Sequence, residues 1–187
     1  MNLGEQIRTA TPKARARFTG AVYLVYFLLA FGGASLHSHP AMLRALNLAS
    51  LAVYALLTVL LYFMFEPVSR SVSLLAALFS FAGCTFAVIE MLHLTHYVVS
   101  PLVFFGFYCL LLGQLTIRSG FLPKILGLLL VVAGLGWLLF LFPYMKPFNA
   151  VTEVLGIVAE GAFCLWLLLA GVRPAKANKQ PRRKRHA

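Results

Sequence analysis

The chain has 187 residues, of which 61% are hydrophobic and 11% charged, and its net charge is +11 at pH 7. Soluble domains are about a quarter charged and about half apolar, so this composition excludes a water-soluble globular fold. The length indicates one domain in lipid, without room for a separate soluble catalytic domain. The basic residues gather at the two ends, a pattern typical of membrane orientation rather than of nucleic-acid binding.

Six apolar stretches are long enough to be membrane-spanning helices, because crossing a hydrocarbon core of about 30 Å takes about 20 residues. Pro101 opens the fourth stretch, at a first-turn position where its missing N–H costs no hydrogen bond. The fifth stretch ends at Pro143 and the sixth ends before Arg173. The sequence therefore predicts an all-α polytopic bundle over 18–172, with spans at 18–36, 46–65, 72–94, 101–117, 122–142 and 151–172.

The first of these stretches has an alternative interpretation as a cleaved signal peptide. It follows a basic segment and contains the small residues Gly32-Gly33-Ala34-Ser35. Its apolar region is long for a signal peptide, however, and Leu36-His37 is not a typical cleavage exit. We therefore expect a retained span, which N-terminal sequencing of the mature protein would test.

The distribution of Lys and Arg predicts that both termini are cytoplasmic, because cytoplasmic loops carry the excess of positive charge. In this orientation 14 of the 16 Lys and Arg residues are inside, and only Arg44 and Lys146 are outside. Residues 1–17 then form a cytoplasmic basic segment, and 173–187 form a disordered polybasic tail. The side chains expected at anionic lipid headgroups are Arg118, Lys124, Arg182, Arg183, Lys184 and Arg185.

Two inner turns and a group of glycines have structural interpretations. Gly120 and Pro123 predict a reverse turn between the fourth and fifth spans, and Glu66 and Arg70 predict an interfacial ion pair. Small residues drive helix packing in lipid. The sequence accordingly predicts close helix contacts at the glycines of the fifth span, Gly127, Gly134 and Gly136.

Four stretches together form a recognisable pattern. They are Arg17-Phe18-Thr19-Gly20-Ala21-Val22-Tyr23-Leu24, Glu66-Pro67-Val68-Ser69-Arg70, Arg118-Ser119-Gly120-Phe121-Leu122-Pro123-Lys124, and Glu160-Gly161 with Leu165-Trp166. On these residues the chain resembles the bacterial family called domain of unknown function 4386, over residues 15 to 172. The resemblance implies a multi-pass protein of the bacterial cytoplasmic membrane and, by the family's name, no particular activity. The chain departs from the family's pattern at Tyr108, where the family often has His.

The candidate functional residues are the ionisable groups inside or beside the spans, which default to functional hypotheses because burying them in lipid is costly. In the predicted orientation they lie toward the outer side. Glu90 and His93 are i, i+3 neighbours whose side chains can meet, and Glu160 lies seven residues deeper than Glu153. These four residues form the candidate intramembrane site, and Glu160 is its deepest member. One hydrogen bond locking helix packing is the alternative role for Glu160.

The imidazole and carboxylate groups of this outer region also suggest a divalent metal as a cofactor. Such ligands suit Zn, Fe, Mn or Cu. The spacing Glu-x-x-His-x-x-His differs from the zinc hydrolase motif His-Glu-x-x-His, and histidines at a span end also serve as interfacial residues. The speculative ligand set is His37, His39, Glu90, His93, His96 and Glu160.

Three functions fit the sequence. The first is an integral membrane protein that handles protons, cations or a small molecule at the outer His/Glu cluster. The second is a membrane-embedded metal-dependent enzyme acting on a lipid-like substrate, and the third is a non-catalytic interaction or structural module. The expected partners are the lipid bilayer and anionic headgroups. No nucleic acid is expected, and the oligomeric state stays open.

Overall fold

A computed structural model describes residues 11–32, 39–94 and 99–172. The described part of the chain contains six helices long and apolar enough to cross a membrane, with mean hydropathy between 1.3 and 2.3, and it contains no strand. The predicted all-α architecture of six spans is therefore confirmed. The helices are α2 (Pro12–Gly32), α3 (Pro40–Phe65), α4 (Arg70–Met91), α5 (Pro101–Ser119), α6 (Lys124–Leu138) and α7 (Asn149–Leu169).

The ends of the helices differ from the predicted spans. Helix α2 begins at Pro12 and α3 at Pro40, six residues before the predicted starts at 18 and 46. Proline is favoured in a first helical turn, where its fixed φ is already helical. The apolar pattern stops at polar residues, but backbone hydrogen bonding continues through them, because Lys and Arg can extend to the headgroup region. The fifth span ends in a 3-10 helix, η2 (Leu139–Leu141), and a second one, η3 (Pro143–Phe148), leads into α7.

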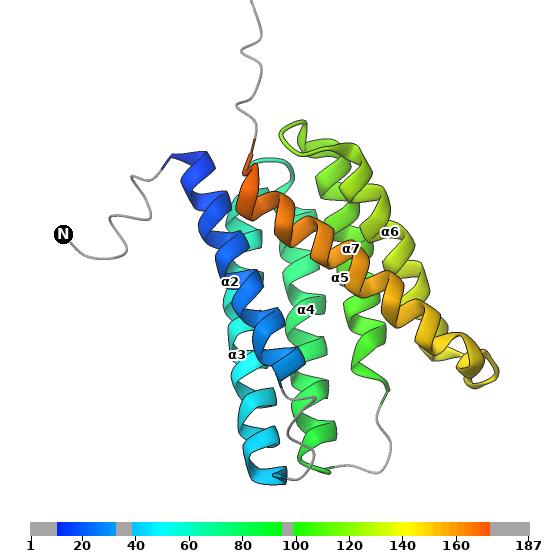
Figure 1. The fold of residues 1–187 in the computed structure, drawn as a ribbon. Coiled ribbons are helices and arrows are strands. Elements are labelled where there is room, and N and C mark those ends of the chain that lie inside the picture. The colour runs from blue at the N-terminus through cyan, green and yellow to red at the C-terminus, as the bar shows by residue number, and fades with distance from the viewer. Residues whose placement is uncertain (1–10, 33–38, 95–98, 173–187) are drawn as a thin grey trace, which may run out of the picture.

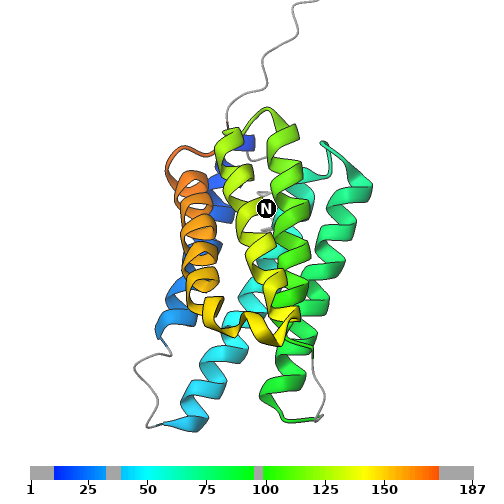
Figure 2. The same ribbon diagram turned by 90° about the vertical axis from the view of Figure 1, so that its right-hand side faces the viewer.

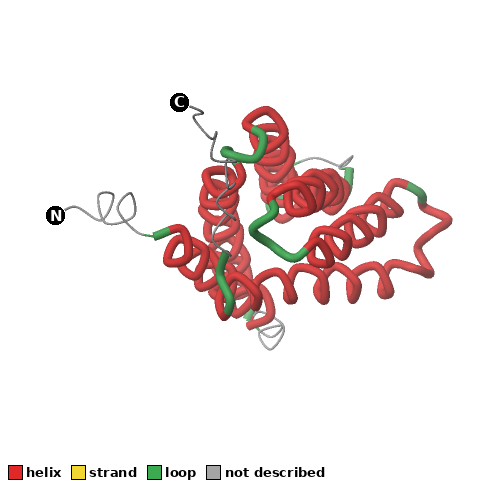
Figure 3. Tube along the Cα trace, turned by 90° about the horizontal axis from the view of Figure 1, so that it is seen from above, coloured by secondary structure: helices red, strands yellow, loops and turns green. Residues whose placement is uncertain are grey.

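The helices pack in chain order, and the last closes against the first. Each helix contacts its neighbours in sequence, and α7 also packs on α2. Short loops join α3 to α4 and α5 to α6 (Figure 3). Consecutive helices run in opposite directions (Figure 1), as short connections require. We call the end of the bundle with Pro12, Arg70 and Lys124 the basic end, and the end with Gly32 and Met91 the opposite end. Figure 2 shows the link between α6 and α7 at the opposite end.

Helices α5 and α6 are held at backbone contact by paired glycines. A Cβ atom on Gly127 would lie 2.6 Å from the carbonyl oxygen of Gly113, and one on Gly134 would lie 2.7 Å from that of Gly106. The predicted packing roles of Gly127 and Gly134 are therefore confirmed. Gly136 faces α7 instead, because a Cβ there would lie 3.4 Å from the side chain of Thr152.

The two turns at the basic end also form as predicted. Gly120 ends α5 with φ +67°, a left-handed conformation that glycine adopts without steric cost, and Pro123 is the N-cap of α6. The Arg70 Nε atom lies 3.5 Å from Glu66 Oε1. Both features lie at the basic end, so the sequence pattern identified these turns correctly.

The outward faces of the helices are apolar, whereas several small polar side chains are buried between them. Leu28 and Leu169 are exposed by 65% and 69%, which is suitable for contact with lipid tails. Inside the bundle, the hydroxyl groups of Thr58 and Ser80 are 2.6 Å apart and join α3 to α4. Buried polar groups need such partners because lipid offers none.

Candidate functional site

Glu160 lies near the middle of the bundle. It is 11 residues after the start of α7 and 9 before its end, and it is only 9% exposed. The predicted span from 151 to 172 would place it in the outer half of that span. The helix begins at Asn149 and ends at Leu169, which places Glu160 close to the middle of the helix.

The carboxyl group of Glu160 joins three helices. The Tyr23 hydroxyl of α2 donates a hydrogen bond to Glu160 Oε2 at 2.6 Å, and the Cys109 thiol of α5 donates to Oε1 at 3.8 Å. Tyr23 and Cys109 are 1% and 0% exposed. Both carboxyl oxygens therefore have a partner, and these partners are neutral groups.

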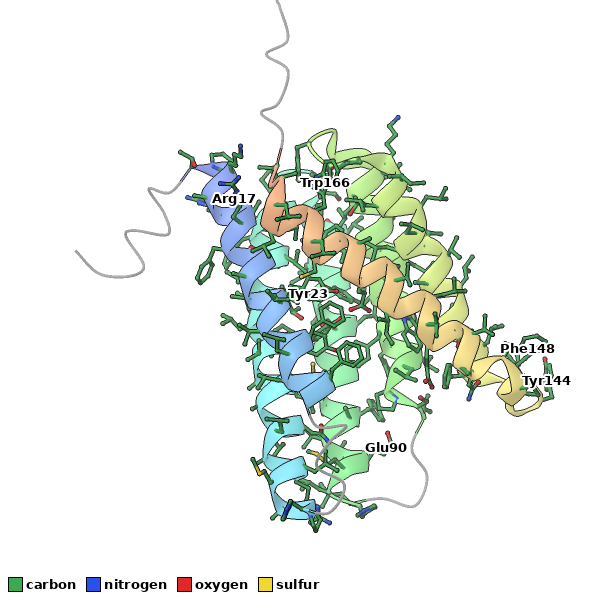
Figure 4. All side chains as sticks on the ribbon, in the orientation of Figure 1. Arg17, Tyr23, Glu90, Tyr144, Phe148 and Trp166 are labelled. Atoms are coloured by element: carbon green, nitrogen blue, oxygen red, sulfur yellow. The ribbon has the colours of Figure 1, made fainter. Side chains whose placement is uncertain are left out.

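The crossing of α2 and α7 places Tyr23 against Glu160. A Cβ on Gly20 would lie 2.5 Å from the backbone nitrogen of Leu168, so only glycine permits this contact. The Cys164 thiol donates to the Gly20 carbonyl at 3.5 Å, and Arg17 donates to the carbonyl of Leu169 at 3.1 Å. Figure 4 shows Arg17 and Tyr23 on the side of α2 near α7. These contacts fix the two helices together toward the basic end.

A cavity of about 230 Å³ lies on the other side of Glu160. On α2 and α5 it extends to Phe31 and Leu102, which lie near the opposite end. Helices α2 and α7 separate toward this end (Figure 1). Phe31 and Ile157, which line the cavity from these two helices, are 51% and 42% exposed. Glu160 is therefore at the deep end of a cavity whose other end approaches the lipid-facing surface.

The wall of this cavity is mainly aromatic. It contains rings from α2, α3, α5 and α6, and Glu160 is its one carboxyl group. The ring centroids of Tyr26 and Tyr54 are 4.7 Å apart, and those of Tyr54 and Phe105 are 5.2 Å apart. The aromatic lining residues are Tyr26, Phe27, Phe31, Tyr54, Phe105 and Trp137.

Tyr108 lies near this site but lines a different cavity. Its ring is 6.2 Å from that of Tyr54, and its buried hydroxyl has no hydrogen-bond partner among the described residues. With Thr58 and Ser73 it lines a cavity of about 10 Å³. A cavity of this size holds at most about one water molecule.

The other sequence-predicted site residues do not gather around Glu160. Glu90, His93 and Glu153 are exposed, and Figure 4 shows Glu90 near the opposite end, away from Tyr23. His39 is also exposed, just before α3. His37 and His96 lie outside the described residues, as do Arg182, Arg183, Lys184 and Arg185. Arg118 and Lys124 are exposed at the basic end.

The predicted metal site does not form among the described residues. No group of three or more His, Cys, Asp or Glu side chains suited to hold a metal ion occurs there. Glu160 is turned toward Tyr23 and Cys109, whereas Glu90 and His93 lie at the end of α4. The partners of Glu160 are therefore groups other than the histidines that the sequence suggested.

His93 has a structural role at the end of α4. Its φ is +52°, its N–H bonds to the Glu90 carbonyl at 3.1 Å, and the N–H of Leu94 bonds to the Ile89 carbonyl at 3.1 Å. This pair of bonds is a Schellman motif, in which the left-handed residue is usually glycine. The backbone of His93 thus helps to close the end of α4.

Replacing His93 with glycine is expected to preserve or raise stability, because glycine adopts positive φ without the steric cost of a Cβ. Replacing it with valine is expected to lower the free energy of unfolding by about 1–2 kcal/mol, since left-handed backbone is unfavourable for β-branched residues. Thermal unfolding of the two purified variants in detergent measures the difference. A valine variant as stable as the glycine variant would contradict the capping role.

The sequence alone did not indicate the residues that complete the site, which are Tyr23, Tyr54, Cys109 and Trp137. The available signal was a polar aromatic residue in the middle of a span, which usually needs a hydrogen-bond partner when buried. Tyr23 lies within the first stretch that carries the family resemblance, but nothing in the sequence pairs it with Glu160.

The fold and the buried carboxyl group define an integral membrane protein with six spans. The family described as Domain of unknown function (DUF4386) matches residues 95–171, which include Cys109 and Glu160. An uncharacterized protein of Archaeoglobus fulgidus is 31% identical over 129 residues, covering 66% of this chain and 80% of the relative. The chain belongs to the DUF4386 family. No solved structure matches it.

Proposed function

We propose that this protein exchanges a proton for a cation or a small cationic molecule at Glu160, and thereby moves it across the membrane. The observation that carries this proposal is a carboxyl group at mid-bundle that faces a cavity and has only neutral partners. No Lys, Arg or His forms an ion pair with Glu160 among the described residues. A buried carboxylate needs compensation, which a proton or an incoming cation can supply.

The groups around Glu160 suit such an exchange. The hydrogen bonds from Tyr23 and Cys109 hold the carboxyl group in place. Tyr26 and Tyr54 line the cavity with it, and Cys164 lies one turn further along α7, bonded to Gly20. None of these side chains is cationic. A cation entering the cavity would therefore meet an acidic group without competition from a fixed positive charge.

The same proposal includes an orientation and a location. Of the described basic side chains, Lys13, Arg17, Arg70, Arg118 and Lys124 lie at the basic end, which we place in the cytoplasm by the rule for positive charge. The cavity would then approach the outer leaflet. The family resemblance supports the bacterial cytoplasmic membrane as the location, with anionic headgroups at the basic end as partners.

Replacing Glu160 with glutamine tests the proposal, because glutamine keeps the shape and can still accept from Tyr23 but cannot exchange a proton. Proteoliposomes loaded with a pH-sensitive dye receive an imposed pH gradient, with Na⁺, K⁺ or tetramethylammonium supplied outside. The wild-type protein is expected to dissipate the gradient several-fold faster than protein-free vesicles with at least one of these cations. The E160Q variant is expected to match protein-free vesicles.

Glu66→Gln is the matched control, because Glu66 is partly exposed at the basic end and should not affect exchange. If the wild type matches protein-free vesicles with all three cations, or if E160Q is as fast as the wild type, the proposed transport is wrong. The second of these results would favour a structural module, for which the junction of α2, α5 and α7 at Glu160 is the supporting observation.

A further inference from the structure

The cavity beside Glu160 combines features of an organic-cation site. Aromatic rings attract cations through the negative potential of their faces, and several rings together form cages for quaternary ammonium groups. Here six aromatic side chains from four helices line one cavity with a single carboxyl group. An inorganic ion would instead require several oxygen ligands, and the lining offers few beyond those of Glu160, Tyr26 and Tyr54.

Three of the lining rings are inclined to one another, whereas Phe27 and Phe31 are stacked with 5° between their planes. Tyr26 and Tyr54 are inclined by 56°, and Tyr54 and Phe105 by 81°. Rings inclined at such angles can surround one guest on several sides and present their faces to it. Tyr54 is 3% exposed and contacts both neighbours, so it forms the corner of this enclosure.

The volume of the cavity suits a small organic guest and is too small for a large drug-like molecule. At about 230 Å³ it exceeds the engineered cavity of about 150 Å³ that accepts benzene, and it is below the range of about 300–1,000 Å³ that is usual for drug-sized ligands. A guest with one aromatic ring and a small ammonium group matches this volume. Entry from the bilayer favours a ligand with an apolar body, since Phe31 and Ile157 at the shallow end are both apolar and exposed.

Two polar groups of the lining lack a partner that they could have. Glu160 lacks an ion-pair partner, and the Trp137 indole lacks a hydrogen-bond acceptor, both among the described residues. The indole N–H is buried, and buried donors are normally paired. The carboxylate form of Glu160 complements a positive guest. A guest with a positive charge would supply the partner that Glu160 lacks.

We infer that this cavity binds a monovalent organic cation, a quaternary ammonium or substituted amine with an apolar body, with its charge beside Glu160 and the aromatic rings. This inference rests on the proposed function of Glu160 and names its substrate class. Binding places the ammonium group near the carboxylate at the deep end. The apolar body then extends between α2 and α7 toward the opposite end.

Isothermal titration calorimetry of the intact protein in a neutral detergent tests the inference with benzyltrimethylammonium as the probe. We expect saturable binding of one cation per chain. The neutral carbon analogue of this probe, neopentylbenzene, has nearly the same shape without the charge. As a competitor it is expected to be about tenfold weaker or worse, because it lacks attraction to the carboxylate and to the ring faces.

Three variants locate the binding. Glu160→Gln is expected to weaken the cation by about tenfold or more, since it removes the paired charge. Phe105→Leu keeps an apolar wall and is expected to weaken the cation by about three- to thirtyfold, while the neutral analogue changes little. Glu66→Gln should bind as the wild type does. Size-exclusion chromatography and thermal unfolding verify that each variant is folded, and Phe105→Leu provides a test even if Glu160→Gln does not fold.

Several results would overturn the inference. Absence of saturable binding would do so, and so would equal competition by neopentylbenzene, which would indicate apolar recognition alone. Equal losses in the Glu66→Gln and Glu160→Gln variants would indicate general adsorption to negative charge. Cation binding without proton exchange in vesicles would leave the site intact and overturn the transport function. Exchange with Na⁺ or K⁺ in a protein that does not bind the probe would overturn the organic-cation site and leave the transport function intact.

Discussion

Replacing Gly127 with alanine is expected to lower the free energy of unfolding by about 1–3 kcal/mol, as overpacking of a tight contact does. The added Cβ would lie 2.6 Å from the Gly113 carbonyl oxygen and 2.9 Å from the backbone nitrogen of Ile117. Both atoms belong to the backbone of α5, so a change of side-chain rotamer cannot relieve the clash. The two helices must move apart, and they form the most extensive helix pair in the bundle.

Gly161→Ala is the matched control for this substitution. A Cβ on Gly161 would meet nothing within 4 Å, and alanine has a higher helix propensity than glycine. We therefore expect equal or slightly greater stability. Thermal unfolding of both variants in the same detergent makes the comparison. Equal losses of stability in the two variants would contradict this prediction, because the contact between α5 and α6 would then not explain the effect of the Gly127 substitution.

Replacing Glu160 with alanine is expected to lower the free energy of unfolding by about 2–4 kcal/mol. The change enlarges the neighbouring cavity and leaves the buried Tyr23 hydroxyl without its acceptor. Glutamine keeps the volume and an acceptor oxygen, so Glu160→Gln should cost less than about 1.5 kcal/mol. Chemical or thermal unfolding of the purified variants measures both values.

The partner of this hydrogen bond provides an independent check. Tyr23→Phe removes the donor hydroxyl and keeps the ring, which packs against Phe27 at a centroid distance of 5.3 Å. In the Tyr23→Phe background, Glu160→Ala should cost less than it does in the wild type, because the hydroxyl that it would orphan is already absent. Strictly additive losses would show that Tyr23 and Glu160 do not interact, contrary to the structure.

Much of the fold could be predicted because the hydropathy of a segment indicates whether lipid or water surrounds it. The six spans, the turn at Gly120 and the pair Glu66–Arg70 follow from local chemistry, and all are present. The boundaries were less accurate. Helix α2 starts at Pro12 in basic sequence, and α3 starts at Pro40, ahead of Arg44. Helical hydrogen bonding does not depend on whether a side chain meets lipid or headgroups.

The candidate site could be predicted only in part. Glu160 was identified because a carboxyl group deep in an apolar span is costly and needs a reason. Its expected companions Glu90 and His93 have a spacing that would let their side chains meet on one helix. In the structure, His93 is instead the left-handed residue that caps α4. The actual partners, Tyr23 and Cys109, are 137 and 51 residues away from Glu160 in the chain.

The sequence by itself determined the number of spans, the two turns at the basic end and the deep carboxyl group of Glu160. Only the tertiary structure decided that α7 crosses α2 at Gly20 and that Glu160 faces Tyr23 and an aromatic cavity. The physical reason is the solvent. In lipid the outward and inward faces of a helix are almost equally apolar, so a sequence carries little amphipathic signal for how each helix is rotated. Close packing of small residues sets that rotation, and it becomes visible only when the helices are together.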